Sequence, residues 1–215
     1  MPHQRQRLLV ALCLSVCLLQ AHAQSPADTA GPASAQARHA LQWVLEHDDH
    51  GRRPFAIVDK QSARIHVYAA SGSPLGSSPV LLGLTPGDQG LSAPLGGRDP
   101  QSLPPTERTT PAGRFETQPG RNLKGEAIVW LDYAAALAIH RLRPAPAHER
   151  REQRMHSARP EDHRISLGCV VVPVAFYEQV VAPTLGRAPA VVYILPETRS
   201  AATPFGPGEA AADAL

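Results

Sequence analysis

Residues 164–173 read Arg-Ile-Ser-Leu-Gly-Cys-Val-Val-Val-Pro, and the interpretation of the chain starts from this stretch. Serine and glycine precede Cys169 and an apolar run follows it, which predicts a loop that carries the thiol at its apex. Pro173 is suited to the first position of a helix, where its missing N–H costs nothing. The stretch therefore predicts a thiol in a loop that is followed by a helix.

The other two cysteines, Cys13 and Cys17, lie near the start of the chain. Two arginines precede an apolar run over 8–19, and residues 21–23 read Ala-His-Ala, the pattern of a secretory signal peptide with its cleavage site. The run is shorter than the roughly 20 residues of a membrane-spanning helix. We expect cleavage after Ala23, export to the periplasm or secretion, and no integral membrane segment in the mature protein.

Cleavage would leave Cys169 as the single cysteine. In an oxidising compartment cysteines normally pair, and a solitary one cannot form an internal disulfide. Such a thiol is either a small buried hydrophobe or a reactive group. We expect Cys169 to react.

Length and charge set broad limits. The chain has 215 residues and a formal net charge of +2, with arginines scattered among acids, which does not favour a nucleic-acid partner. We expect a signal peptide (1–23), a linker and N-terminal helix (24–53), one catalytic domain (54–196) and a disordered tail (197–215). The sequence indicates no oligomeric state.

The apolar pattern predicts an α+β domain that is mostly β with flanking helices. A helix is predicted over 35–49 and a hairpin from 55–58 and 64–68. Further strands are predicted at 79–84, from Phe115, at 127–133, at 138–140 and at 191–195. The Gly/Pro-rich segment 85–105 is long for a loop and is expected to border the site.

A nucleophilic thiol needs a base. His140 ends an apolar run that would fix its ring, so it is the preferred candidate, and His163 is the alternative. His148 and His156 lie in charged sequence. The N–H groups of Gly168 and Cys169 could bind a developing oxyanion. Together these groups predict acyl transfer through a thioester.

Two other patterns are weaker. Asp132 could orient His140 or serve a turn. His148-Glu149 begins like a zinc motif, but Glu152 stands where the second histidine is required. We expect neither a metal nor a cofactor.

Three motifs resemble those of the YkuD-type L,D-transpeptidases: Thr110-Pro-Ala-Gly-Arg-Phe115, Ala138-Ile-His140 and Ser166-Leu-Gly-Cys169. The resemblance covers about residues 54–196. It implies a β-sandwich-like domain that attacks peptidoglycan stem peptides, releases D-alanine and passes the acyl group to an amine. It also implies that Cys169 is the nucleophile, His140 the base, Gly168 and Cys169 oxyanion donors, and Ser166 a loop-fixing hydrogen bonder.

The chain departs from the family pattern at two positions. Leu167 replaces a usual histidine, and Val171 replaces a polar residue expected to orient substrate or loop. Arg164 or Arg141 could compensate. The charged segment 141–163 is an insertion that could form a lid.

Three function classes follow from these residues. An L,D-transpeptidase and an L,D-carboxypeptidase or endopeptidase share the thioester and differ in whether an amine or water attacks it. A peptidoglycan-binding protein with lapsed catalysis is the third. Retention of both His140 and Cys169 favours an active enzyme, with transfer preferred over hydrolysis.

Overall fold

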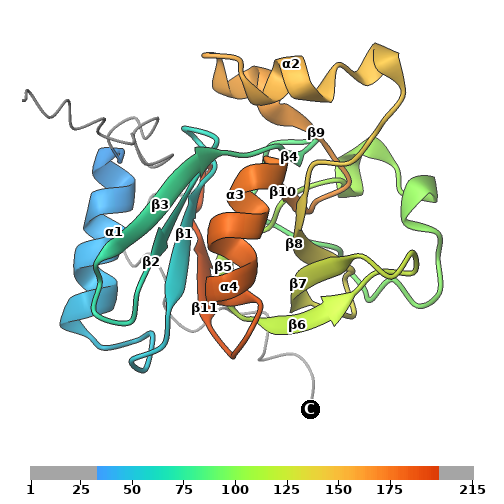
Figure 1. Ribbon diagram of the computed structural model, residues 1–215. Coiled ribbons are helices and arrows are strands. Elements are labelled where there is room, and N and C mark those ends of the chain that lie inside the picture. The colour runs from blue at the N-terminus through green and yellow to red at the C-terminus, as the bar shows by residue number, and fades with distance from the viewer. Residues whose placement is uncertain (1–32, 199–215) are drawn as a thin grey trace, which may run out of the picture.

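A computed structural model describes residues 33–198, so the predicted signal peptide, most of the linker and nearly all of the tail lie outside the described residues. The elements form two packed sheets with helices at their faces (Figure 1). In order, the helices and strands are α1 (Ala35–Glu46), β1 (Phe55–Asp59), β2 (Arg64–Tyr68), β3 (Pro74–Pro79), β4 (Leu82–Gly83), β5 (Gly113–Glu116), β6 (Gln118–Arg121), β7 (Ala127–Asp132), β8 (Leu137–Arg141), α2 (Arg151–Met155), β9 (Arg164–Ser166), β10 (Val170–Val172), α3 (Val174–Phe176), the π-helical turn η6 (Tyr177–Val181), α4 (Ala182–Leu185) and β11 (Val191–Ile194). Four short 3₁₀ turns lie at Pro100–Ser102, Pro105–Glu107, Ala147–Glu149 and Pro160–His163.

The predicted class, α+β and mostly β, is confirmed. One sheet has the order β3-β2-β1-β11-β5 and the other has the order β10-β8-β7-β6, while β4 and β9 form a separate parallel pair. Most neighbouring strands are antiparallel, but β1 pairs with β11 and β8 pairs with β10 in parallel.

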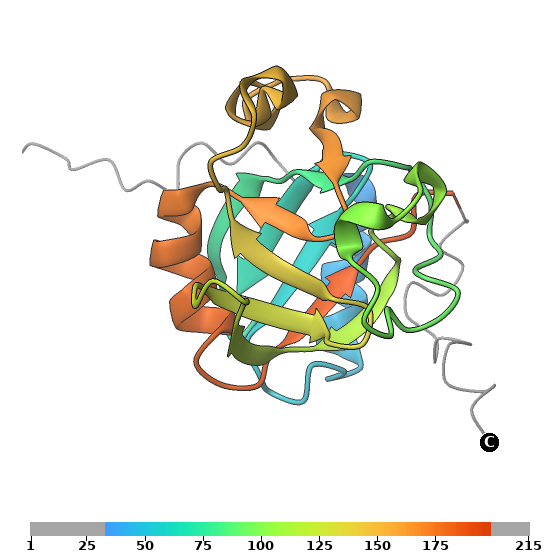
Figure 2. The ribbon, with the colours of Figure 1, turned by 90° about the vertical axis from the view of Figure 1, so that its right-hand side faces the viewer.

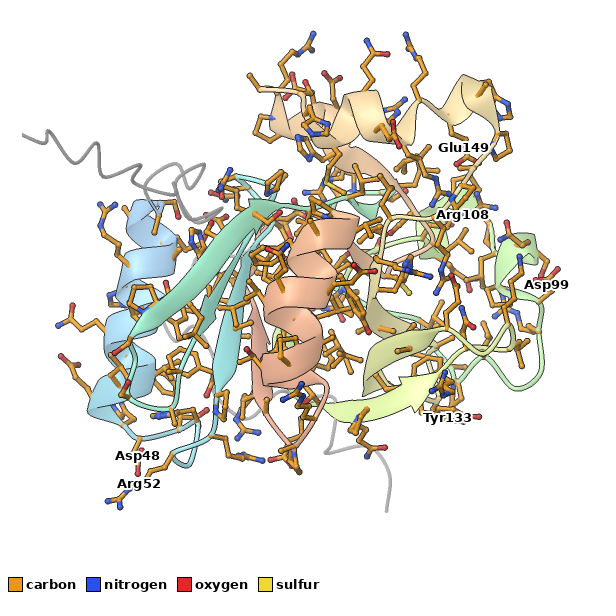
Figure 3. The ribbon with its side chains drawn as sticks, in the orientation of Figure 1. Asp48, Arg52, Asp99, Arg108, Tyr133 and Glu149 are labelled. Carbon is orange, nitrogen blue, oxygen red and sulfur yellow. The ribbon has the colours of Figure 1, made fainter. Side chains whose placement is uncertain are left out.

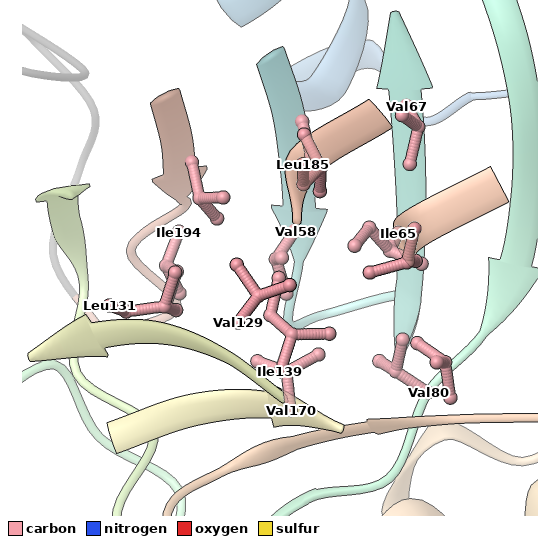
Figure 4. Close-up of a cluster of buried hydrophobic side chains, with 14 of the residues drawn as sticks. Val58, Ile65, Val67, Val80, Val129, Leu131, Ile139, Val170, Leu185 and Ile194 are labelled. Atoms are coloured by element: carbon pink, nitrogen blue, oxygen red, sulfur yellow. The ribbon is translucent and has the colours of Figure 1, made fainter. Parts of the chain in front are cut away.

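The main core lies between the two sheets. Side chains from both inner faces meet there, including Val58, Ile65, Val129, Ile139 and Val170, all fully buried (Figure 4). The helical segment α3-η6-α4 closes this core with Tyr177, Val181 and Leu185. Pro183 lacks the N–H that an α-helical bond requires, which accounts for the π-helical turn just before it.

A second core covers the outer face of the five-stranded sheet. Ser34 caps α1 by accepting a hydrogen bond from the Ala37 N–H at 3.0 Å, and α1 places Ala40 and Val44 against Phe55 and other buried side chains of β1 and β11. All five residues of β1 are therefore buried. The predicted helix and hairpin are confirmed, although His66, expected on a polar face, lies beneath this cover and is 6% exposed.

Two strand assignments need correction. The strand predicted at 79–84 is replaced by the short β4 and the buried residues Val80 and Leu81. An unpredicted strand, β3, spans Pro74–Pro79 at the sheet edge, where prolines are tolerated because no further strand requires their N–H groups. Segment 85–105 contains little regular structure, as expected, and its Leu95 N–H donates to Ala134 O at 2.9 Å in the turn before β8.

The residues of this long loop lie on the side of the molecule away from α1. Figure 3 shows Asp99, Arg108 and Tyr133 there, opposite Asp48 and Arg52, which follow α1. The tail boundary at 197 is also corrected, because the N–H groups of Glu197 and Thr198 both donate to the Asp88 carboxylate, at 2.8 and 3.0 Å. Within residues 33–198, no helix is long and apolar enough to cross a membrane.

Candidate active site

The cysteine loop connects β9 to β10 and is held by its own serine. Ser166 Oγ donates to Cys169 O at 2.7 Å and accepts from the Gly168 N–H at 3.1 Å. Gly168 has a φ of +133°, and a Cβ at this position would lie 3.0 Å from the backbone oxygen of Thr109. Only glycine fits this geometry, and the loop-fixing interaction implied for Ser166 is present.

Thr110 holds the same loop from the side. Its hydroxyl donates to Gly168 O at 2.7 Å and accepts from the Gly83 N–H at 2.8 Å. Thr110 is fully buried. Sequence reasoning treated this residue only as part of a turn, yet it is the contact that joins the Thr-Pro-Ala-Gly turn to the cysteine loop.

Strand pairing brings His140 and Cys169 together. The strands β10 and β8 lie side by side (Figure 2). In their parallel register, Val170 lies opposite Ile139 and Val171 lies opposite His140. Because side chains alternate between faces, Cys169, which directly precedes Val170, projects from the same face as His140. The predicted pair therefore occupies neighbouring positions on adjacent strands.

The imidazole is set up to accept a proton. His140 Nδ1 lies 2.8 Å from Arg141 O, which assigns the N–H to Nδ1 and leaves the Nε2 lone pair free. Burial lowers the pKa of His140 to about 4, and the positive charge of Arg143 acts in the same direction. His140 is therefore neutral at ordinary pH.

The thiol is also neutral at rest. Cys169 is partly exposed, and its Sγ donates to Ala136 O at 3.4 Å. Burial of the sulfur raises the pKa of Cys169, opposed by the Ala138 N–H and by the charge of Arg143. The resting site thus holds a thiol and a neutral imidazole rather than an ion pair.

One predicted oxyanion donor is unavailable. The Gly168 N–H already donates to Ser166 Oγ inside the buried loop, so it cannot also bind a developing oxyanion. The prediction for Gly168 is corrected to a conformational role. The N–H of Cys169 stays a predicted donor.

The predicted supporting residues have other partners. Arg164 is 10% exposed, pairs with Glu197 and donates to Lys60 O at 3.1 Å, so it is not free to contact substrate. Arg141 forms ion pairs with Glu126 and Glu178, at 3.4 and 3.2 Å.

Of the two roles considered for Asp132, the structure shows the turn role, and His163 is occupied by other contacts. Asp132 is exposed and accepts from the Ala135 N–H at 3.0 Å, which is a turn role. His163 is 3% exposed, and both ring nitrogens lie against carbonyl oxygens, Val80 O at 2.8 Å and Ser157 O at 3.0 Å. It anchors the insertion and has no ring nitrogen left to serve as the alternative base.

Val171 is fully buried and packs with Leu81 and Met155. Met155 belongs to α2, in the insertion 141–163, so the insertion covers the position where a polar residue was expected. Leu167 is only partly buried.

Within residues 33–198 no three or more His, Cys, Asp or Glu side chains are grouped as a metal site would require.

Two cavities lie away from the thiol. One, of about 500 Å³, is lined by polar residues including Arg121, Arg141 and Glu178. The other, of about 670 Å³, lies between β3, α2 and the helix after Pro173. Neither is lined by Cys169 or His140.

No protein-family model and no curated protein matches the sequence. Solved structures with a similar backbone include several L,D-transpeptidases. The catalytic domain of the Enterococcus faecium enzyme is 16% identical, with a TM-score of 0.38 over 67% of this chain and 98% of that one. The Xylanimonas cellulosilytica enzyme is 14% identical, with a TM-score of 0.40, and the match covers 66% of this chain and 60% of that one. A third structure, LdtMt1 in complex with imipenem, is 15% identical, with a TM-score of 0.37, and the match covers 66% of this chain and 58% of that one.

Replacing Gly168 by alanine should destabilise the fold by about 2–3 kcal/mol, because alanine resists the positive φ and its Cβ meets Thr109 O. Gly97→Ala is the matched control, since Gly97 also has a positive φ (+84°) but nothing within 4 Å of the new Cβ. Urea unfolding should show the smaller loss for the control. Equal losses would contradict the steric argument.

The low pKa of His140 makes stability depend on pH. The unfolded histidine binds a proton near pH 6.5 and the folded one only near pH 4, so the free energy of unfolding should fall as pH drops through this window. The difference corresponds to about 3 kcal/mol. The His140→Asn variant should lose the pH dependence of the unfolding free energy that His140 contributes, while the contributions of other titrating groups stay the same. Urea unfolding of both proteins between pH 4 and 7 measures it, and parallel pH profiles would refute the assignment.

Proposed function

We propose that the chain is an exported cysteine acyltransferase that performs L,D-transpeptidation on peptidoglycan stem peptides. The observation that supports this most directly is the position of Cys169, at a loop apex on the same face as His140, whose Nε2 is free to accept a proton. The substrate class is inferred from the three motifs around this pair, which resemble those of YkuD-type enzymes.

The first half-reaction forms a thioester. His140 Nε2 takes the thiol proton as Sγ of Cys169 attacks the carbonyl carbon on the L side of the L,D bond. The Cys169 N–H stabilises the oxyanion of the tetrahedral intermediate. When this collapses, the carbon–nitrogen bond breaks, the imidazolium returns its proton to the leaving amine, and D-alanine departs.

The second half-reaction releases the acyl group. His140 removes a proton from an incoming amine, which attacks the thioester, and the sulfur leaves to regain a proton as the new amide forms. Water in place of the amine would give an L,D-carboxypeptidase or endopeptidase, the second candidate function. A lapsed binding protein is less favoured, because Val171 is accounted for by packing against Met155 and both reacting groups are retained.

The neutral resting pair fits this scheme. With the pKa of Cys169 raised and that of His140 lowered by burial, the thiolate forms only as the proton moves to Nε2. Attack and deprotonation then occur together at the bound carbonyl.

The location of the activity is part of the proposal. Residues 1–23 have the pattern of a cleavable signal peptide, so we place the mature enzyme in the periplasm or outside the cell. Its substrate there is the stem peptide, and no cofactor enters the mechanism.

A protein beginning at Gln24 should convert a labelled tetrapeptide muropeptide to a cross-linked dimer with release of D-alanine. Cys169→Ala and His140→Asn should each lower the rate by at least about 10³-fold, because each removes a reacting group. Arg159→Ala, at an exposed ion pair with Glu161, is the control and should keep full activity. Mass spectrometry distinguishes dimer from tripeptide. Tripeptide alone would replace transfer by hydrolysis, and D-alanine release by Cys169→Ala would refute the nucleophile.

A carbapenem should acylate Cys169, because its strained lactam carbonyl presents the thiolate with an amide to open. Intact-mass spectrometry should show one adduct on the wild-type protein and none on Cys169→Ala. The adduct should form more slowly below pH 4, where His140 is protonated. Absence of any adduct at neutral pH would favour the binding-protein alternative.

A further inference from the structure

A cluster of four buried charges lies behind the cysteine loop. Lys60 is fully buried directly after β1, and its Nζ donates to Asp88 Oδ1 and to Thr110 O, both at 2.9 Å, and to Gly87 O. Glu197 Oε1 lies 3.4 Å from the same nitrogen. Arg164 completes the cluster by pairing with Glu197. Two cations and two anions are therefore enclosed together.

The cluster is rigid for an electrostatic reason. The four side chains are between 0% and 10% exposed, so each charge depends on the others rather than on water. Removing one partner leaves an uncompensated charge in a region of low dielectric constant. Segments that meet at Lys60, among them the turn with Asp88 and the chain at Thr110, are thereby fixed relative to each other.

Thr110 transmits this fixed position to the reactive loop. Lys60 holds the Thr110 carbonyl, and the Thr110 hydroxyl donates to Gly168 O at 2.7 Å. Gly168 O and the Cys169 N–H belong to one planar trans peptide unit, in which the two groups point in opposite directions. Holding the oxygen on the Thr110 side therefore directs the N–H away from Thr110.

The direction of this N–H matters because the other candidate donor is occupied. The Gly168 N–H donates to Ser166 Oγ. The Cys169 N–H is close to the thiol of the same residue and lowers the pKa of Cys169 against the larger effect of burial. Glycine at 168 has few steric barriers to rotation of the following peptide unit. The Thr110 hydroxyl bonds this unit directly from outside the loop and adds to the Ser166 hydrogen bonds on either side of it.

We propose that Thr110, braced by Lys60, is a positioning residue that orients the Cys169 N–H as the oxyanion donor. Its role in turnover rests on the proposed function. Its effect on acylation of the thiol does not, because any ester that acylates Cys169 passes through a tetrahedral oxyanion.

The test compares two reactions of the same thiol. Acylation by p-nitrophenyl acetate forms an oxyanion, whereas alkylation by iodoacetamide does not, and intact-mass spectrometry with Cys169→Ala as background follows both. Thr110→Val should lower the ratio of acylation to alkylation rates by about tenfold or more, as expected for a misdirected oxyanion donor. Thr110→Ser keeps the hydroxyl and should keep the wild-type ratio.

Thr117→Val is the matched control. Thr117 is also buried, donates to Leu185 O at 3.1 Å and accepts from the Ala190 N–H at 2.9 Å, away from the cysteine loop. It should lose stability without changing the ratio. Lys60→Met, if it folds, should also lower the ratio of acylation to alkylation rates. If Lys60→Met does not fold, the result for Thr110→Val decides the test.

The outcomes separate this proposal from the proposed function. A wild-type ratio in Thr110→Val, or an equal fall in Thr117→Val, would overturn the role of Thr110. With the tetrapeptide, Thr110→Val should lower kcat with little change in KM. A lowered ratio in a protein whose wild-type form does not process the tetrapeptide would support the role of Thr110 and refute the substrate assignment.

Discussion

The parallel register of β8 and β10 is the constraint on which the site depends. A shift of one residue would turn Cys169 to the opposite face from His140 and separate the two reacting groups. Burial on both faces prevents the shift. Val170 and Val172 enter the core between the sheets, while Val171 packs under Met155 on the other face. The three consecutive valines therefore fix the register that aligns the thiol with the imidazole.

Burial also determines the chemistry of the pair. It raises the pKa of Cys169 and lowers that of His140, so both groups rest without charge. A thiol that is not a thiolate at rest reacts slowly with oxidants. In the proposed mechanism, the proton moves from sulfur to Nε2 only as the substrate carbonyl is attacked. Orientation of the few available N–H donors becomes correspondingly important, and the fixed peptide unit between Gly168 and Cys169 meets that need.

Local sequence patterns predicted the reactive pair and most of the elements, but not the partners of the charged residues. Cys169 could be chosen because it is the single cysteine outside the predicted signal peptide, and His140 because it ends a short apolar run. The helix α1 could be predicted because its apolar residues recur at helical spacing. β3 was missed because Pro74, Gly76 and Pro79 are tolerated only at an edge, and an edge is a property of the assembled sheet. Arg164 was expected near substrate because its partner Glu197, 33 residues away, was assigned to the tail. Thr110 was read as a turn residue because nothing local indicates that its hydroxyl reaches Gly168 O, 58 residues later.

Valine at position 171 has an explanation in segment 141–163. A polar side chain at position 171 would share its face with Cys169, but here α2 covers that position and supplies Met155 as an apolar neighbour. A charged side chain buried under Met155 without a partner would be costly. Valine at 171 is therefore compatible with the helix α2 above it, whereas a charged residue there would not be. His163 fastens the end of the insertion to the buried chain at Val80 O. Segment 141–163 thus covers position 171 with an apolar contact, and the orienting role that we propose lies with the peptide unit between Gly168 and Cys169.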